Sequence, residues 1–290
     1  MAIKFFGQFL IDKKIITRRD LLRAIELQEK TNLRFGDLVI EMGLMTTEQI
    51  SLTLRAQRHE DLQFGDMAIK MGFLSPDQVK QVLNRQKREH LYIGEALVKL
   101  ETITREKLSF YLGEFKQPQK ASVPEKIIIP AGVPHQPVWE IVADMTYKML
   151  ARVAGATFQT GPCTIISRLP TRPVVVEIGF YGSINARYFL TISDNTRKLL
   201  ASAMFKEGKI ATGTADEVDD SVKEFVNIIC ANVVSKATQL GYSIDTTSAQ
   251  MRLLNNADLE IPEDQTGLLF PIYVSNGEIF ELTICCPKDV

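Results

Sequence analysis

The sequence lacks the features that mark membrane-spanning, disulfide-stabilised and metal-binding proteins. No apolar run approaches the roughly 20 residues that span a bilayer, and the apolar stretch at the N-terminus is too short and interrupted for a signal peptide. We therefore expect a cytoplasmic protein that does not insert into a membrane. Only four of the 290 residues are cysteine, and none are in C-x-x-C spacing, so neither a zinc site nor a disulfide framework is predicted.

The sequence also lacks a large excess of charge of either sign. Residues 1–120 carry 20 Lys and Arg against 16 Asp and Glu, and the remaining residues carry 14 against 19. This mild excess is far from the clustered basic surface of a nucleic-acid-binding protein, so no nucleic-acid partner is expected. The three histidines are scattered, and no Walker or dinucleotide-binding glycine motif is present. Kinase, protease and metal chemistry are therefore not indicated.

What the first half does contain is a repeat of 29 residues, marked by Gly7, Gly36, Gly65 and Gly94. A hydroxyl residue recurs in the same register, where it can cap a helix by accepting a hydrogen bond from a first-turn amide. A glutamine recurs near the end of each capped helix, except in the fourth repeat. The hydroxyl and glutamine positions are Thr17, Thr46, Ser75 and Thr104, followed by Gln28, Gln57, Gln86 and, in place of the fourth glutamine, Phe115.

These signals predict an all-α domain of four helical hairpins over residues 1–116. Each repeat contains a short helix, a turn and a longer capped helix with one apolar stripe. A single hairpin cannot bury that stripe, so we expect neighbouring repeats to stack and cover it.

The second repeat resembles the N-terminal domain of MshE-type ATPases of type II secretion and type IV pilus assembly, in which tandem copies bind cyclic di-GMP. The resemblance implies cyclic di-GMP as a ligand. In that family the motif arginine, which is Arg34 here, contacts a guanine and a phosphate, and the motif leucines pack on the ligand. The arginine is replaced by Phe5, Gln63 and Tyr92 in the other repeats. A packing scaffold without a ligand is the alternative. The implied nucleotide-binding residues are Arg34, Phe35, Gly36, Val39, Ile50, Leu54, Gln57, Gln63 and Gly65.

Five of the twelve prolines lie between Lys116 and Pro137, and they indicate a semi-extended linker over residues 117–136. Beyond it, periodicity predicts an α+β domain with a mostly antiparallel sheet over residues 137–290. Asn276 and Gly277 are expected to supply two positive φ angles in a hairpin turn. The expected helices span 138–153, 194–206 and 216–240, and the expected strands lie within 163–169, 173–182, 186–193 and 268–286.

The helix predicted over residues 216–240 has two faces. Its core stripe consists of Val222, Phe225, Val226, Ile229, Val233 and Leu240. The opposite face mixes acidic, amide, small and aliphatic residues, and its apolar members would be left in water unless something covers them. A docking surface for a partner and a second layer of this chain's own structure both remain open. This face consists of Asp220, Glu224, Asn227, Ile228, Ala231, Val234 and Ser235.

The C-terminal region resembles the CheX/CheC family of chemotaxis phosphatases over most of residues 137–290, on the strands that begin at Pro173 and on this helix, and it is closer to CheX. The family motif E-x-x-N falls on Glu224 and Asn227, and Asp220 and Asn232 match the extended pattern. The resemblance implies that both motif residues enter the active site of a phosphorylated CheY-like response regulator, with Asp220, Ile228, Ala231 and Val234 docking around them. It also implies a homodimer through the C-terminal domain, and magnesium on the partner with no intrinsic cofactor.

The sequence thus favours a signalling protein in which a helical sensor or interaction module controls aspartyl-phosphate hydrolysis on a response regulator. The alternative is a non-catalytic adaptor that binds a response regulator or a pilus or secretion motor protein through the same surfaces.

Overall fold

The computed structural model describes residues 5–57, 60, 62–115, 126–204, 214–253 and 259–288. The chain separates into two compact units, Met1–Gln119 and Lys120–Val290. The junction predicted at residues 116–117 lies outside the described residues. Within the described ranges, no helix is long and apolar enough to cross a bilayer.

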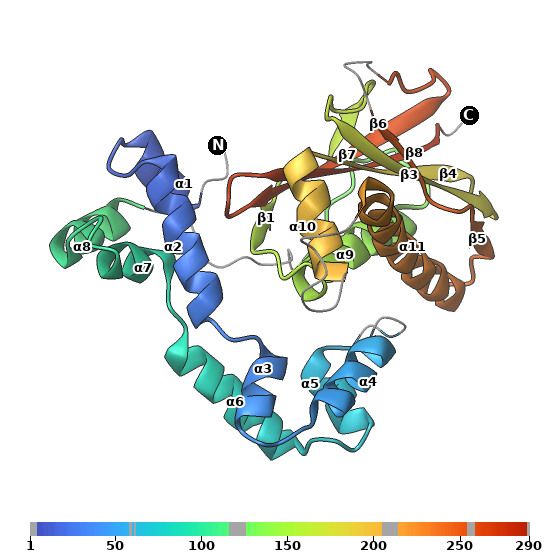
Figure 1. The fold of residues 1–290 in the computed structure, drawn as a ribbon. Helices are drawn as coiled ribbons and strands as arrows, with labels where there is room; N and C mark the ends of the chain where they lie inside the picture. The colour runs from blue at the N-terminus through green and yellow to red at the C-terminus, as the bar shows by residue number, and fades with distance from the viewer. Residues whose placement is uncertain are drawn as a thin grey trace. The chain divides into compact units, whose positions relative to one another are not determined.

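The described part of the N-terminal unit consists of short helices that alternate with longer capped ones (Figure 1). The predicted caps are in place, since the hydroxyl oxygens of Thr17, Ser75 and Thr104 accept hydrogen bonds from first-turn amides. The helices are α1 (Phe6–Asp12), α2 (Arg18–Thr31), α3 (Phe35–Glu41), α4 (Thr47–Gln57), α5 (Phe64–Lys70), α6 (Pro76–Glu89), α7 (Ile93–Lys99) and α8 (Arg105–Glu114).

The repeats do not stack in chain order, and the expectation of neighbour-on-neighbour stacking is wrong for the outer two. One core joins the first repeat to the fourth, with Phe6 and Leu21 packed with Leu97. A second core joins the second repeat to the third, with Leu38 packed with Val82. Figure 1 shows α1, α2, α7 and α8 as one group and α3 to α6 as another.

The repeated glutamines connect these pairs. Gln28 Nε2 donates to the carbonyl of Leu91 at 2.8 Å and Gln57 Nε2 to that of Leu62 at 2.9 Å. Gln86 Nε2 donates to the carbonyl of Leu33 at 3.2 Å. Each glutamine therefore binds the carbonyl of the residue that lies three positions before the repeated glycine of its partner repeat. Phe115, at the fourth position, packs against Phe6 and Phe9 instead.

The C-terminal unit contains a mostly antiparallel sheet with strand order β1-β7-β8-β4-β3-β5, in which β2 also pairs with β7 and β6 with β3. Its helices are α9 (Gln136–Arg152), α10 (Asp194–Met204) and α11 (Ala215–Gln239). Its strands are β1 (Phe158–Thr160), β2 (Thr164–Ile166), β3 (Val174–Gly182), β4 (Ala186–Ile192), β5 (Ile244–Thr246), β6 (Gln250–Leu253), β7 (Gln265–Val274) and β8 (Ile279–Pro287).

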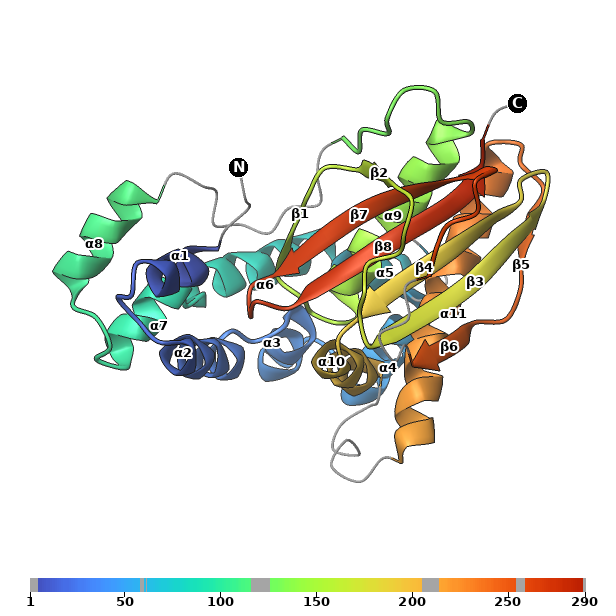
Figure 2. The same ribbon diagram turned by 90° about the horizontal axis from the view of Figure 1, so that it is seen from above.

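The three helices cover one face of this sheet (Figure 2). Alternate strand residues point to that face and form the main core, for example Val176, Tyr188 and Ile284. Cys286 belongs to this core, whereas Cys285 belongs to a small cluster on the other face, because successive strand residues point in opposite directions.

The turn between β7 and β8 differs from the expected two-residue turn. Only Gly277 has a positive φ, of 87°, and Asn276 does not. The loop contains three residues, because Val274 N donates to the carbonyl of Glu278 at 2.9 Å. A three-residue hairpin loop needs one residue in the left-handed region, and glycine adopts it without strain.

Candidate functional site

Helix α11 begins at a capping box, in which Thr214 Oγ1 accepts from Glu217 N and Glu217 Oε2 accepts from Thr214 N. It packs against α9, α10 and the β3, β5 and β6 side of the sheet. The predicted core stripe is buried as expected, apart from Leu240. Leu240 follows the last helical residue, which explains why 54% of its surface is exposed.

The opposite face of α11 is only partly open. Asp220, Glu224 and Ala231 are exposed, whereas Asn227 and Val234 are half-buried. Ile228 is 9% exposed and belongs to the main core, so its assignment to an exposed docking face is wrong. It lies one turn after the buried Phe225, and the cover from the sheet and neighbouring helices extends past the predicted stripe to reach it.

The two acidic residues on this face differ in their partners. Asp220 forms an ion pair with Lys223 at 2.6 Å, and the hydrogen bond between them raises the pKa of the Lys223 ammonium. Within the described ranges, no hydrogen bond or ion pair engages the Glu224 carboxylate. Glu224 is therefore an accessible carboxylate that no described residue of this unit pairs with.

The amide of Asn227 is held in one orientation. Its Oδ1 accepts a hydrogen bond from the backbone N–H of Ala249 at 3.1 Å. Because a backbone N–H can only donate, the atom facing it must be the amide oxygen. The Nδ2 group therefore points away from that contact, and among the described residues it has no acceptor. The neighbouring Asn232 differs, since its Nδ2 donates to the carbonyl of Ile228 at 2.8 Å in its own helix.

The thiols of Cys163, Cys230 and Cys285 are protonated at neutral pH. Burial raises the pKa of Cys163 to about 12 and that of Cys285 to about 12, and it raises the pKa of Cys230 as well. No three His, Cys, Asp or Glu side chains converge as metal ligands in the described parts of the chain. The two motif residues of α11, Glu224 and Asn227, thus offer a carboxylate and an amide, which can position and neutralise reactants.

The structure does not gather the nine predicted nucleotide-binding residues into one cavity. Val39, Ile50 and Gly65 are buried in the packing of the second and third repeats, which places them out of reach of a ligand. A Cβ at Gly65 would lie 2.9 Å from Cγ1 of Val79, so this glycine permits helix contact. Gln57 Nε2 donates to the carbonyl of Leu62, and the ring of Phe35 packs at a tilt against that of Phe64, with ring centroids 5.7 Å apart. Gly36 is half-buried against Ile50, and Arg34, Leu54 and Gln63 are exposed.

Of the three exposed residues in this set, Arg34 borders a cavity. A hollow of about 170 Å³ is lined by Arg34 with Asn32, Gln86 and His90, where the α2–α3 and α6–α7 connections meet. The guanidinium of Arg34 has no ion pair among the described residues.

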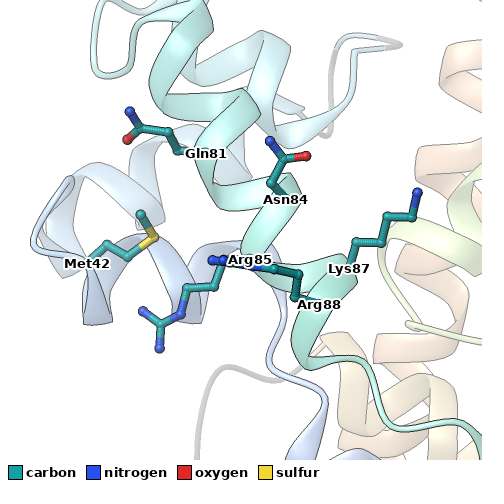
Figure 3. A pocket seen from close by; sticks show the side chains of 6 residues that line it. All are labelled: Met42, Gln81, Asn84, Arg85, Lys87 and Arg88. Atoms are coloured by element: carbon teal, nitrogen blue, oxygen red, sulfur yellow. The ribbon is translucent and has the colours of Figure 1, made fainter.

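A wider and more open hollow of about 840 Å³ lies between α3 and α6. Figure 3 shows Arg85 extending from α6 toward Met42, whereas Lys87 points away from them. Arg85 is already paired with Glu41 and Glu89. The hollow is lined by Met42, Gln81, Asn84, Arg85, Lys87 and Arg88, none of which the sequence had indicated.

Sequence patterns did not indicate the segment Thr247–Ala249, which holds Asn227. Its contact joins residues 22 positions apart and depends on how α11 lies on the sheet. No local motif marks it.

Comparison with known proteins identifies the region that contains α11. Residues 174–273 match the family model described as chemotaxis phosphatase CheX. No curated protein matches the chain.

Several solved structures are similar to about half of the chain. A chemotaxis protein CheX from Desulfovibrio desulfuricans is 15% identical over 52% of this chain and 99% of its own, with a TM-score of 0.43. A putative chemotaxis protein from Desulfovibrio vulgaris Hildenborough is 17% identical over 53% and 98%, with a TM-score of 0.45. A CheX–CheY–BeF3–Mg complex from Borrelia burgdorferi is 19% identical over 52% and 98%, with a TM-score of 0.42.

The matched residues include β3, β4, the whole of α11 and most of β7, and thus both Glu224 and Asn227. Residues 174–273 of this chain are a CheX-family domain.

Proposed function

We propose that the C-terminal unit hydrolyses the aspartyl phosphate of a CheY-like response regulator. The observation that carries the proposal is the pair formed by the accessible carboxylate of Glu224 and the oriented amide of Asn227, one helical turn apart within a CheX-family domain. Neither group is a nucleophile, and hydrolysis of an acyl phosphate does not need one from this chain, because water attacks phosphorus directly.

In this proposal, Asn227 orients the attacking water in line with the bond that breaks. The oxygen of water bonds to phosphorus, the bond between phosphorus and the aspartyl oxygen breaks, and inorganic phosphate leaves with the regulator's carboxylate restored. Positioning accounts for much of the acceleration of such a reaction, since little covalent help is needed. The phosphorylated aspartate and the magnesium ion belong to the regulator.

Glu224 pairs with a lysine of the regulator and fixes the approach of the two proteins. Ala231 is exposed one turn beyond Asn227 and borders that approach. Asp220 contributes less to binding, since its charge is already paired with Lys223. Complementary charge of this kind chiefly sets association rate and orientation.

The experiment measures phosphate release from a panel of purified CheY-like regulators phosphorylated with acetyl phosphate and Mg²⁺. The full chain is expected to shorten the phosphoaspartate lifetime of at least one regulator, and Asn227→Ala is expected to remove this effect. Gln239→Ala is the matched control, because it removes an exposed amide near the end of the same helix. Unchanged lifetimes across the panel would exclude the phosphatase. Binding of a beryllofluoride-activated regulator without any rate increase would instead support the non-catalytic adaptor.

For the N-terminal unit we propose binding of cyclic di-GMP as the control on this activity. The exposed, unpaired guanidinium of Arg34 beside a hollow supports the proposal, together with Leu54, which is 42% exposed on the capped helix of the same repeat. A guanidinium can bond two acceptors of a guanine edge and neutralise phosphate.

Calorimetric titration of cyclic di-GMP tests this part. Arg34→Ala should weaken binding at least tenfold, corresponding to about 1.4 kcal/mol. Arg55→Ala is the control, since it removes an exposed arginine from the same repeat. Equal affinity in both variants, or no heat with the wild-type chain, would leave the unit as a packing scaffold.

We also propose that the C-terminal unit forms a homodimer, which light scattering at assay concentration would detect or exclude.

A further inference from the structure

The segment that holds Asn227 contains a β-bulge. Phe180 of β3 pairs with Thr246, and Glu177 of β3 pairs with Gln250. Two residues of β3, Ile178 and Gly179, therefore lie opposite the three residues Thr247, Ser248 and Ala249. One extra residue locally disrupts the ladder and redirects the backbone groups beside it.

Thr247 holds the bulge against β3 through its backbone N–H and its hydroxyl. Its backbone N–H donates to the carbonyl of Gly179 at 2.9 Å, and its Oγ1 accepts from the N–H of Gly179 at 2.9 Å. The side chain lies over Gly179, where an added Cβ would come within 3.3 Å of Thr247 Cγ2. The hydroxyl thus takes the place of the backbone carbonyl that a regular ladder would supply.

The other end of the bulge faces α11. The methyl group of Ala249 packs against the main core, and its N–H, turned away from β3, donates to Asn227 Oδ1 at 3.1 Å. A half-buried backbone N–H needs an acceptor, and Asn227 supplies it. Because the bond fixes both groups, the bulge also fixes the amide.

We propose that the bulge Thr247–Ala249 positions Asn227 for catalysis, with Thr247 as a positioning residue, so that the amide presents its Nδ2 donors to the phosphorylated regulator. The inference rests on the proposed phosphatase activity. Because Oδ1 is turned toward the Ala249 N–H, the group of Asn227 that faces outward is Nδ2, which donates to the water oxygen or to a phosphoryl oxygen. The working feature of the side chain is therefore its NH2 group.

The first test uses Asn227→Asp. Aspartate keeps an oxygen for the Ala249 N–H but replaces the outward NH2 group with a second acceptor. At saturating regulator, this variant should lose the acceleration as fully as Asn227→Ala. Hydrogen exchange of the Ala249 amide should stay slow in Asn227→Asp and become faster in Asn227→Ala. Activity retained in Asn227→Asp would show that the acceptor oxygen does the work and would overturn the proposal.

The second test uses Thr247→Val, which removes the hydroxyl that accepts from Gly179. We expect kcat to fall about tenfold while KM for the phosphorylated regulator stays within about twofold, since misplacing a catalytic group by about 1 Å can cost about 100-fold. Thr247→Ser keeps the hydroxyl, and its kcat should therefore stay close to the wild-type value. Ser183→Ala is the matched control, because Ser183 Oγ bonds the carbonyl of Ser243 at the far end of the same strand pair at 2.9 Å.

The outcomes separate the two claims. Wild-type kcat in Thr247→Val, or an equal loss in Ser183→Ala, would overturn the positioning role while leaving the phosphatase intact. Absence of any acceleration by the wild-type chain would remove the phosphatase itself, and the hydrogen-exchange comparison would still show whether the bulge fixes the Asn227 amide.

Discussion

Glu224 and Asn227 differ in how much of their bonding capacity this chain uses. Within the described ranges Glu224 has no partner, so its replacement should leave the fold unchanged. Asn227 accepts the Ala249 N–H, and truncation to alanine leaves that donor unpaired, at a cost of about 1 kcal/mol or somewhat more. Measurements on Asn227 variants therefore need a stability control, whereas those on Glu224 report on the partner directly.

Glu224→Gln should raise KM for a phosphorylated regulator by several-fold with a smaller change in kcat, because it removes a charge that attracts and orients the partner. Glu224→Lys should raise KM further through like-charge repulsion. Increasing salt should raise the KM of the wild-type protein by a larger factor than that of Glu224→Gln, since exposed charges are screened. Glu263→Lys, at an exposed carboxylate of the same unit, is the control. Equal salt dependence in wild type and Glu224→Gln would contradict this role.

At the scale of the residue, helical periodicity predicted that Glu224, Asp220 and Ala231 share an exposed face, because a helix fixes which side chains lie together. It could not predict that Ile228 is buried or that Asn227 is bonded to Ala249. Both depend on how far the sheet extends beside α11, which is a contact between distant parts of the chain. Similarly, Val39 and Ile50 match a ligand-binding motif but are used for packing.

Among the elements of the N-terminal unit, three of the repeated glycines, Gly7, Gly65 and Gly94, allow close helix contact. Gly65→Ala places a Cβ 2.9 Å from Val79 and should destabilise this unit by about 1–3 kcal/mol. Gly113 lies in α8 with no atom within 4 Å of an added Cβ. Gly113→Ala should therefore stabilise its helix by up to about 1 kcal/mol. Urea unfolding of both variants checks the prediction, and the same sign of change in both would contradict it.

The longer elements could be predicted from the sequence, and the pairing of the repeats could not. Caps at Thr17, Ser75 and Thr104 and the apolar period define helices locally. The match of the first repeat to the fourth depends on long-range packing, which a repeat with equal spacing does not encode. The strands β1, β5 and β6 contain three or four residues each, which is too few for a period to be recognised.

For the whole molecule, each hydrophobic core is built from residues of one unit only. We expect the full chain to unfold in two calorimetric transitions. Gly65→Ala should lower the midpoint temperature of only one transition, that of the N-terminal unit. Leu190→Ala, at a fully buried position of the sheet, should shift the other transition, because it lowers the free energy of unfolding of the C-terminal unit by about 2–5 kcal/mol. A single transition that both variants shift equally would show that the units unfold together.

The central claim is that an asparagine on the exposed side of α11 accelerates hydrolysis of another protein's aspartyl phosphate. Single-turnover decay of a phosphorylated CheY-like regulator under saturating full-length chain tests it most directly. We expect fast decay with the wild-type chain and the spontaneous rate with Asn227→Ala, while the circular dichroism spectrum of that variant stays native. Decay at the spontaneous rate with both proteins, or equal acceleration by both, would contradict it.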